Sequence, residues 1–567
     1  SPGYEYFFHW ILGNNFGYNF STITNTNDAG QGSLRQFILN SNELDNTNLD
    51  QEDSPIGGVS FTKDPGWETS IFMIPGNSTH TIQPTSILDN ITDPKTHISG
   101  YTQSGSSQGT INARTLNIEL VGNSSFDGLR IYADDVQVSG LALHTFYKGI
   151  SSFKPNSTNT FVWGNYIGVQ EDGITAADNV NNGIEYENIT NSFIGTNGDN
   201  VNDANEGNLI AKGYGRVVLE KTSNVLVAGN YIGTDKTGNT SLNSNYIGVA
   251  IYDATDPNYI GYNDAATNPN ASDFRNVISG NGTDGIRISN SDNQVVSGNY
   301  IGTNATGLAA IGNGNYGVQL LGAVNNNIIG TNSNGDSDIL ERNIMSGNGG
   351  GFRTSSSSSG TGNKIQGNYI GTDVTGNVAL QNNTHGLLFS GNVSNTLVGT
   401  NGDGINDNIE GNVIAGNDND GIRVGTNSNT IAGNKIGVGA DGTTVLGNGE
   451  RGIFLATGAT NNIIGYSSTM TNTNELIVGN QIKNNTTHGI SLDNTVGTGN
   501  RISRNQIADN GGLGIDLNHD GVSPNDNGDA DNGANNRLNF PVITSSTLVG
   551  NNLTIKGFAP AGSPIEF

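Results

Sequence analysis

An acidic cluster near the end of the chain carries the side chains that a hard cation prefers. Residues Asp516 to Gly521 read D-x-N-x-D-G, so carboxylate and amide oxygens surround a glycine turn, as in a Ca²⁺-binding loop. The Glu that closes an EF-hand at its twelfth position is absent, because Asn527 stands there. Two interpretations stay open: a Ca²⁺ site that stiffens a domain boundary, and a solvated linker. The predicted metal ligands are Asp516, Asn518, Asp520, Asp526, Asp529 and Asp531.

Four tyrosines recur, each within the phrase G-N-Y-I-G, and form a column if each phrase occupies an equivalent place. An exposed column of rings can stack on sugars or pack on a neighbouring molecule. The residues expected at this position in intervening units are apolar, which instead favours packing in a corner of the core. The predicted ligand-binding residues are Tyr166, Tyr231, Tyr300 and Tyr369, and the intervening residues are Phe193, Leu209, Tyr259, Val277 and Ile328.

Residues for catalysis are harder to find. A hydrolase needs two or three convergent carboxylates, and a lyase of acidic polysaccharides needs a basic residue near cation-binding acids. Arg130, Arg287 and Arg423 recur in D-G-[LI]-R and repeat with the scaffold, which favours a structural role. Asp134 and Asp135 are adjacent, so they point to opposite faces of a strand. We therefore assign no catalytic residue, and a polysaccharide lyase or glycoside hydrolase remains the alternative function.

Short acidic loops recur as well. Thr234–Gly238 and Thr372–Gly376 read T-D-x-T-G, and Asn197–Asp199 and Asn401–Asp403 read N-G-D. An Asp in such a loop typically accepts a hydrogen bond from the chain two residues further on. We therefore predict Asx-turns in these loops rather than ligand sites.

An internal repeat must position all of these residues. Three short phrases each return at nearly constant intervals: G-N-Y-I-G with one G-N-K-I-G variant, an apolar pair followed by Gly, and an Asn followed by an apolar pair. Three phrases in one period of about 67 residues predict a basic unit of about 22. The first phrase begins at Gly164, Gly229, Gly298, Gly367 and Gly433, the second ends at Gly195, Gly261, Gly330, Gly399 and Gly465, and the third begins at Asn208, Asn276, Asn343 and Asn412.

A unit of this size fits one coil of a right-handed parallel β-helix, with two or three strands of about 4–6 residues joined by tight turns. The segment Asp284–Ile288 reads as a turn followed by an alternating strand. Asn at the corners can donate and accept, so we expect ladders of Asn between stacked coils. Residues 110 to 518 leave room for roughly 18 coils, which predicts a rod of roughly 90 Å.

Different patterns flank the repeat. Gly32–Asn40 predicts a short amphipathic helix with Ser33 as its N-cap and an apolar face that covers the first coil. Ile71–Gln103 alternates Ile-rich strands with turns and predicts the first coils. Three regions follow: an aromatic segment and cap at 1–60, the β-helix at 61–540, and an incomplete β-sandwich at 541–567. The expected strands of the β-sandwich are Val542–Thr547, Leu553–Gly557 and Ile565–Phe567.

The flanking segments also resemble a known family. Thr24–Gln36, which reads T-N-T-N-D-A-G-Q-G-S-L-R-Q, is similar to the opening of large secreted surface proteins of the CSLREA-associated β-helix type. The resemblance spans roughly residues 20–567 and implies an exported, very long protein with this architecture. It implies no activity, and residues 1–19 depart from the pattern. The other segments that carry the resemblance are Ile82–Pro84, Ile91–Pro94, Gly100–Gln103, Leu513–Leu517, Gly521–Asp526 and Asn539–Ile543.

Charge and composition narrow the function further. The chain has 24 Lys and Arg against 51 Asp and Glu, a net charge of −27, which argues against a nucleic-acid partner. It has no cysteine, so a catalytic thiol or disulfide is excluded, and no apolar run is long enough for a membrane helix. We expect a non-enzymatic extracellular or cell-surface protein, a rigid adhesin or filament component. Its expected partners are further copies of itself, other surface proteins or glycans, and the aromatic segment at 1–19 packs either on a neighbouring subunit or on its own first coils.

Overall fold

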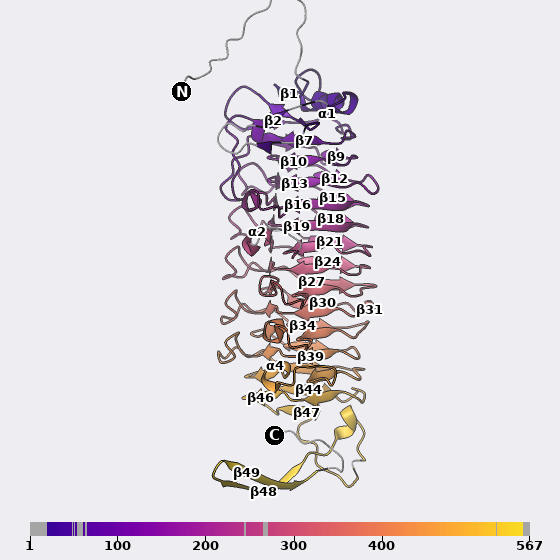
Figure 1. Cartoon of the computed structure of the whole chain (residues 1–567), viewed down its shortest axis with the longest axis vertical. Helices are drawn as coiled ribbons and strands as arrows, with labels where there is room; N and C mark the ends of the chain where they lie inside the picture. Colours follow the sequence, from indigo (N-terminus) through magenta and orange to yellow (C-terminus); the bar gives the residue numbers. More distant parts are fainter. Residues whose placement is uncertain are drawn as a thin grey trace, which may run out of the picture.

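The computed structural model describes residues 20–559 except 48, 50, 54–60, 63–64, 212, 243–244, 265–269 and 529. Successive coils stack along one axis (Figure 1), and their strands form three long parallel sheets of 14, 14 and 13 strands. The chain is therefore a right-handed parallel β-helix, as the repeat predicts. Among the described residues, no helix has the length and apolar character needed to cross a membrane.

The three sheets are named here by their order along each coil. Sheet 1 contains β4 (Glu68–Thr69), β7 (Thr96–Ser99), β10 (Gln137–Ser139), β13 (Phe161–Trp163), β16 (Thr190–Gly195), β19 (Ser223–Ala228), β22 (Tyr259–Gly261), β25 (Val295–Ser297), β28 (Ile328–Gly330), β32 (Lys364–Gln366), β36 (Leu397–Gly399), β39 (Thr430–Ala432), β42 (Ile463–Gly465) and β45 (Arg501–Ser503). Sheet 2 contains β6 (His80–Ile82), β8 (Ile118–Val121), β11 (Ala142–His144), β14 (Tyr166–Ile167), β17 (Leu209–Ile210), β20 (Tyr231–Ile232), β23 (Val277–Ile278), β26 (Tyr300–Ile301), β29 (Ile344–Met345), β33 (Tyr369–Ile370), β37 (Val413–Ile414), β40 (Lys435–Ile436), β43 (Gln481–Lys483) and β46 (Gln506–Ala508). Sheet 3 contains β9 (Leu129–Ile131), β12 (Ile150–Ser152), β15 (Asn182–Glu187), β18 (Gly215–Glu220), β21 (Ile247–Tyr252), β24 (Ile286–Ser289), β27 (Tyr316–Leu321), β30 (Gly350–Thr354), β34 (Leu387–Phe389), β38 (Ile422–Val424), β41 (Ile453–Leu455), β44 (Ile490–Asp493) and β47 (Ile515–Asn518).

The coil is longer than the sequence predicts. In sheet 2, Tyr166 pairs with Leu209 and Leu209 pairs with Tyr231, so a long interval between paired residues alternates with a short one. The period of about 67 residues thus holds two coils, not three, because the first and third phrases occupy the same sheet in consecutive coils. The predicted unit of about 22 residues and the predicted count of roughly 18 coils are wrong: sheet 1 has 14 strands, which gives a rod of roughly 60 Å.

The interior is a single apolar column. Alternation along each strand sends one residue inward, as with Ile167, Ile210 and Ile232 in sheet 2, which are all fully buried. Because each of these residues lies directly over its counterpart in the next coil, Ile, Val and Leu pack face to face along the whole rod.

Asn ladders run along the corners, as predicted. In the longest, each side-chain amide donates to the Oδ1 of the next Asn at 2.8–3.2 Å, and the backbone N–H donates to the same oxygen in most steps. All of these side chains except Asn505 are buried, so the ladder satisfies polar groups that water cannot reach. The members are Asn165, Asn208, Asn230, Asn276, Asn299, Asn343, Asn368, Asn412, Asn434, Asn480 and Asn505.

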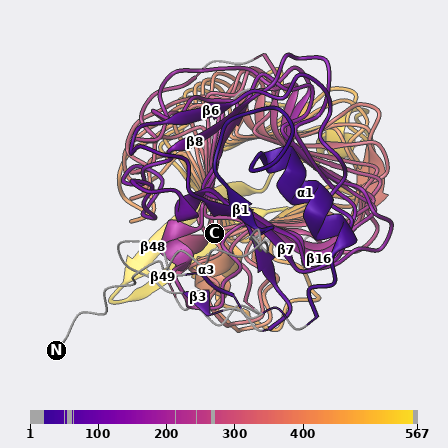
Figure 2. The same cartoon turned by 90° about the horizontal axis from the view of Figure 1, so that it is seen from above.

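The first coil is capped by α1 (Leu34–Glu43), which confirms the predicted helix. The Ser33 hydroxyl accepts a hydrogen bond from the backbone N–H of Gln36, as an N-cap should. Leu34, Phe37 and Ile38 are buried and join the central core. Seen down the axis (Figure 2), α1 lies across the end of the coils, so it covers the open edge of the stack.

Short elements complete the chain. The hairpin of β48 (Val542–Val549) and β49 (Asn552–Phe558) is antiparallel and lies beyond the last coil (Figure 1), where two of the three expected strands were placed. The third expected strand, Ile565–Phe567, and the aromatic segment at 1–19 lie outside the described residues. The remaining elements are β1 (Thr22–Ile23), β2 (Glu52–Asp53), β3 (Phe61–Thr62), β5 (Ile71–Phe72), β31 (Ser359–Thr361), β35 (Asn392–Ser394), α2 (Ala271–Phe274), α3 (Asp407–Glu410), α4 (Glu475–Val478) and three 3₁₀ turns at Gly100–Thr102, Asp203–Asn205 and Ala534–Arg537.

Candidate functional site

Residue types on the outer face of sheet 3 change along the rod. Leu129 and Ile131 of β9 are buried in the core, so Arg130 between them faces outward. The residues in register with Arg130 on later coils range from charged to aromatic and small. In axial order they are Arg130, Ser151, Glu185, Val218, Ala250, Arg287, Gln319, Arg353, Leu388, Arg423, Phe454, Ser491 and Asp516.

The first five coils of this face form a groove. It consists of two adjoining depressions of about 210 and 190 Å³ that share Lys148 and Glu185. We call these lining residues the sheet 3 groove. They are Asp127, Arg130, Lys148, Ser151, Ser152, Phe153, Asn181, Asn182, Glu185, Glu187, Tyr214, Gly215, Val218, Glu220, Ile247, Ala250 and Tyr252.

The charged groups of the groove hold one another in place. The Lys148 ammonium lies 2.9 Å from the Glu185 carboxylate, which also accepts a hydrogen bond from the Asn182 amide. Arg130 lies 4.0 Å from Asp127 and covers the ring of Phe153 at 5.0 Å. Burial raises the pKa of the Asp127 carboxyl, although Lys148 and Arg130 lower it. Four carboxylates against two basic side chains leave the groove acidic.

An aromatic pair lies at the edge of the groove, where Tyr214 is a lining residue and Tyr246 contacts it from the next coil. The rings of Tyr214 and Tyr246 lie 4.4 Å apart on successive coils, and 55% and 40% of these residues remain exposed. Each tyrosine immediately precedes a strand of sheet 3, so both sit at the same corner. Flat, exposed rings beside hydrogen-bonding groups suit the apolar face and hydroxyls of a sugar.

The recurring arginines on the outer face of sheet 3 form ion pairs with nearby acids. In each D-G-[LI]-R segment the Arg pairs with the Asp three residues earlier, at 4.0 Å for Arg130, 2.5 Å for Arg287 and 3.5 Å for Arg423. The buried Asp420 also contacts Arg451 at 2.6 Å. Arg287 and Arg423 therefore neutralise the buried Asp284 and Asp420, while Arg130 pairs with the partly exposed Asp127, which agrees with the structural role expected from their repetition.

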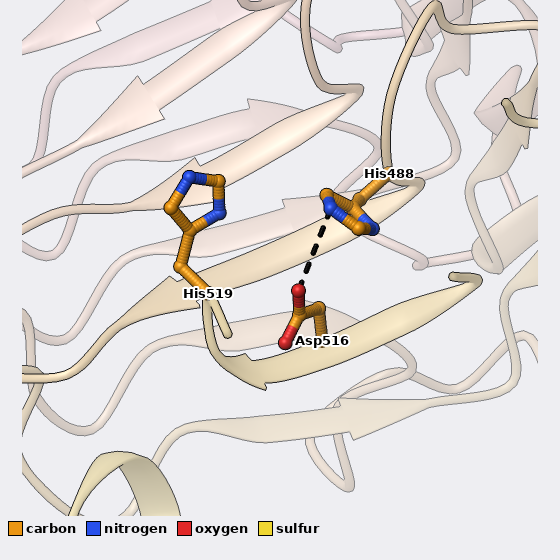
Figure 3. A group of neighbouring side chains, drawn as sticks. All are labelled: His488, Asp516 and His519. Atoms are coloured by element: carbon orange, nitrogen blue, oxygen red, sulfur yellow. Dashed lines mark ion pairs between the residues drawn. The ribbon is translucent and has the colours of Figure 1, made fainter. Parts of the chain in front are cut away.

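The predicted calcium ligands do not all meet at one point in the described residues. Asp516 is buried and faces His488 and His519 (Figure 3), the one member of the set within a group of three potential metal ligands. Asp520 instead pairs with Arg537 at 3.0 Å, and Asp526 accepts a hydrogen bond from the backbone of Ala530. Asn518 donates to Asp520, Asp531 is partly exposed, and Asp529 lies outside the described residues.

Hydrogen bonds explain the histidine group without a cation. The backbone N–H of Leu513 donates to Nδ1 of His488, which places the proton of the neutral ring on Nε2, 3.4 Å from Asp516. A metal at Asp516 would need that nitrogen without its proton. Nδ1 of His519 contacts the Ser491 hydroxyl at 2.9 Å. The arrangement therefore satisfies a buried carboxylate at the last coil, and a Ca²⁺ site among residues 516–531 stays a prediction.

The tyrosine column is packed rather than open. Tyr166 and Tyr300 are buried, so the expectation of exposed rings for glycan stacking is wrong at these two positions. Gly238 and Gly307 lie so close to the rings of Tyr231 and Tyr300 that an added Cβ would come within 2.9 Å. The loops therefore cover the column.

Arginines cover the other faces of two of these rings, with Arg275 over Tyr300 at 4.2 Å and Arg342 over Tyr369 at 4.1 Å. The residues expected at the same position as the tyrosines divide between two sheets. Leu209 and Val277 lie in sheet 2, in register with the tyrosines, but Phe193, Tyr259 and Ile328 lie in sheet 1.

The short acidic loops form the turns expected of them. In the T-D-x-T-G loops, Asp235 accepts from the Thr237 hydroxyl at 2.8 Å, and Asp373 accepts from the backbone N–H of Thr375 at 3.1 Å. The N-G-D segments, however, begin longer loops that bury further carboxylates, among them Asp203 and Glu206. Burial, with Asp203 and Asp199 nearby, raises the pKa of Glu206 to about 8.

The raised pKa of Glu206 predicts a pH dependence of stability. Its folded-state value lies above the ordinary 4.5, so its contribution is complete below about pH 4.5 and is lost as the pH rises through 8. The loss amounts to on the order of 1 kcal/mol per pH unit. Urea unfolding at pH 5.5 and 7.5 should show a smaller decrease for Glu206→Gln than for the wild type. Equal decreases would contradict the assignment.

Fold and groove together define a parallel β-helix with a polar groove on the outer face of one sheet. No protein-family model matches the sequence. The Dettilon tailspike protein gp208 superposes with a TM-score of 0.40 at 15% identity, over 69% of this chain and 61% of that one. The chain thus spans about 61% of the tailspike's length.

Two further solved structures are similar at lower scores. The periplasmic alginate epimerase AlgG gives a TM-score of 0.30 at 12% identity, over 84% of this chain and 81% of that one. PfbA, a surface adhesin of Streptococcus pneumoniae, gives 0.26 at 11% identity, over 84% and 89%.

Proposed function

We propose that this protein is a non-enzymatic surface protein of the adhesin type, which binds a glycan in the sheet 3 groove. The observation that carries the proposal is the exposed pair Tyr214 and Tyr246 beside a line of polar side chains. The spacing of successive coils, about 4.8 Å, is close to the length of one sugar ring, so an extended chain lying along the rod meets a new coil with each residue. A rod also holds such a surface away from the cell.

The charge of the groove selects the kind of glycan. Four carboxylates outnumber Arg130 and Lys148, and both basic groups already pair with acids. An anionic polysaccharide would meet repulsion here and in the field of a chain with net charge −27. A neutral glycan needs only ring faces and hydrogen-bonding groups, which the groove supplies. We therefore infer a neutral glycan as the ligand.

The test is glycan binding by variants of the tyrosine pair. Tyr214→Ala removes the more exposed ring and should weaken binding of a neutral hexasaccharide about tenfold, about 1.4 kcal/mol. Leu308→Ala is the matched control, because Leu308 is 56% exposed on a loop outside sheet 3. Calorimetric titration of cellohexaose, chitohexaose and polygalacturonate provides the measurement. Binding to polygalacturonate alone, or equal affinity in Tyr214→Ala, would contradict the proposal.

A polysaccharide-cleaving enzyme is the second candidate. Asp127 and Glu185 line one depression, and burial together with the nearby Glu185 charge raises the pKa of Asp127, as a general acid requires. The arrangement would protonate a leaving oxygen from Asp127 with Glu185 as the second carboxylate. Incubation with the same polysaccharides distinguishes the two candidates. Reducing or unsaturated ends that vanish in Asp127→Asn would favour the enzyme, and intact glycans would favour binding alone.

A further inference from the structure

A lysine and an asparagine lie side by side at one corner of sheet 3, on neighbouring coils. Ile150 of β12 pairs in parallel with Ile184 of β15. Lys148 and Asn182 each lie two residues before a member of this pair, so they occupy the same position on successive coils. The backbone N–H of Gly149 donates to the Asn182 carbonyl at 3.0 Å and fixes this register. Neighbouring strands are about 4.8 Å apart, so the two side chains start close together.

The Glu185 carboxylate contacts both of these side chains. Nζ of Lys148 lies 2.9 Å from each of the two carboxylate oxygens. Nδ2 of Asn182 donates a hydrogen bond to Oε2 of the same carboxylate at 2.5 Å. A single carboxylate thus bridges an amine and the nitrogen of a side-chain amide, so it is placed to move a proton from one nitrogen to the other.

The carbonyl end of the Asn182 amide meets a backbone donor. Oδ1 of Asn182 accepts a hydrogen bond at 3.1 Å from the N–H of Gly215, on the following coil. This N–H polarises the carbonyl and can hold negative charge on Oδ1, as the donor of an oxyanion hole does. Only 7% of Asn182 and 8% of Glu185 are exposed, and the apolar side chains of Val218 and Ile247 line the same depression. The surroundings therefore strengthen these polar contacts.

Two other lysine–acid pairs lack this arrangement. Lys154 lies 2.7 Å from Asp134, whose second oxygen accepts a hydrogen bond from the backbone of Thr158. Lys221 lies 3.2 Å from Glu220. Within the described residues, neither of these two carboxylates accepts a hydrogen bond from an asparagine amide. The Lys154 pair is therefore a matched control for an amine that has a carboxylate but no amide.

We propose that Lys148 and Asn182 become joined by an isopeptide bond, with Glu185 as the proton carrier. Glu185 takes a proton from the Lys148 ammonium, and the resulting amine attacks Cγ of Asn182. The Nζ–Cγ bond forms while the carbonyl electron pair moves to Oδ1, beside the N–H of Gly215. The Cγ–Nδ2 bond then breaks, its electron pair leaves with the nitrogen, and Glu185 protonates that nitrogen. Nζ loses its second proton through the same carboxylate, so an ammonium ion leaves and no group is oxidised or reduced.

The bond staples two neighbouring coils at the edge of the sheet 3 groove. It removes the charge of Lys148 and leaves Arg130 as the remaining basic side chain of the groove. A cross-link also restricts the unfolded chain, which stabilises the folded one. The reaction needs no glycan, because all the reacting groups belong to the protein itself.

Digestion of the unfolded full chain with a glutamate-specific protease tests the bond. Glu171 is the glutamate that lies between Lys148 and Asn182 in the sequence, so cleavage after it separates the two residues. In the wild type we expect the two fragments to stay joined after cleavage. Mass spectrometry should then give a joined mass that is lower by one ammonia molecule than the sum of the two fragments.

Three variants complete the test. Glu185→Gln keeps the size of the side chain but cannot carry the proton, and Lys148→Arg keeps the charge but removes the amine, so both should give separate fragments of full mass. Lys154→Arg is the matched control and should stay linked like the wild type. Wild-type fragments that separate at full mass, or that show deamidation of Asn182 instead of a link, would overturn the proposal. A link that persists in Glu185→Gln or Lys148→Arg would overturn it as well, and the wild-type result decides the question if a variant does not fold.

Discussion

Replacing Asn382 by alanine should lower the free energy of unfolding by ~3–5 kcal/mol, whereas the same change at Asn383 should have almost no effect. Asn382 is a buried member of an Asn ladder. Its amide donates to the Met345 carbonyl at 3.0 Å and to Asn417 at 2.9 Å, and its oxygen accepts from the backbone of Asn348 at 2.9 Å. The Met345 carbonyl keeps the backbone N–H of Gly371 as a donor. Alanine therefore leaves two buried polar groups without a partner, the Asn417 oxygen and the Asn348 N–H, and each costs roughly 1–3 kcal/mol.

The next residue provides the control for this prediction. Asn383 has the same chemistry and the same alanine replacement, but its side chain is exposed. Urea unfolding followed by circular dichroism measures both variants. A loss below about 1 kcal/mol in Asn382→Ala would show that water or local relaxation replaces the ladder, and the ladder would then not be a main source of stability.

Replacing Gly330 by alanine should destabilise the protein by more than ~4 kcal/mol, the second large effect. Gly330 ends the recurring phrase of an apolar pair and Gly, and its φ is +103°. A Cβ there would lie 1.8 Å from the Gln366 carbonyl oxygen of the next coil, which backbone pairing holds in place. The equivalent glycines 195, 261, 399 and 465 give 1.8–2.0 Å. The phrase therefore marks where adjacent coils touch through backbone alone.

Gly458 separates the clash from the backbone conformation. Its φ of +85° also disfavours a side chain, but a Cβ there meets nothing within 4 Å. Gly458→Ala should therefore cost only about 1 kcal/mol, the typical penalty of a left-handed conformation. Thermal unfolding of the two variants side by side gives the comparison. Similar losses at both positions would mean that the φ value, and not the contact between coils, explains why the phrase ends in glycine.

The fold could be predicted from the sequence because stacking imposes repetition. Each coil must place an inward apolar residue, a corner Asn and a turn Gly over those of the last coil, so the phrases return at fixed intervals. The coil length could not be predicted from those intervals. Loops outside the coil have no register to keep, so the interval from Tyr166 to its partner Leu209 is about twice that from Leu209 to Tyr231. The phrases of Tyr166 and Leu209 therefore looked like different parts of one coil.

The groove could not be predicted from the sequence for the opposite reason, because its residues do not repeat. Tyr214 and Tyr246 precede β18 and β21 in segments that share no phrase, and the contact between their rings follows only from the pairing of these two strands. Glu185 and Lys148 likewise meet across two coils. The interval from Tyr214 to Tyr246 was the one available signal, and an assumed unit of about 22 residues concealed it.

The acidic loops were visible in the sequence but interpreted as turns. Asn401–Asp403 does form a turn, since Asp403 accepts from the backbone of Ile405 at 2.8 Å. The buried carboxylates of the loop, Asp407 and Glu410, follow later in the same loop. Their burial depends on the neighbouring loop, which is a property of the stacked coils and not of the segment itself.

A crystal structure with a bound neutral oligosaccharide tests the central claim most directly. The account predicts density for the sugar along the first five coils of sheet 3, with one ring against Tyr214 and Tyr246 and hydroxyls near Glu185 and Lys148. Sugar bound on sheet 1 or sheet 2, or no sugar at a concentration that saturates binding in solution, would contradict the assignment of the groove.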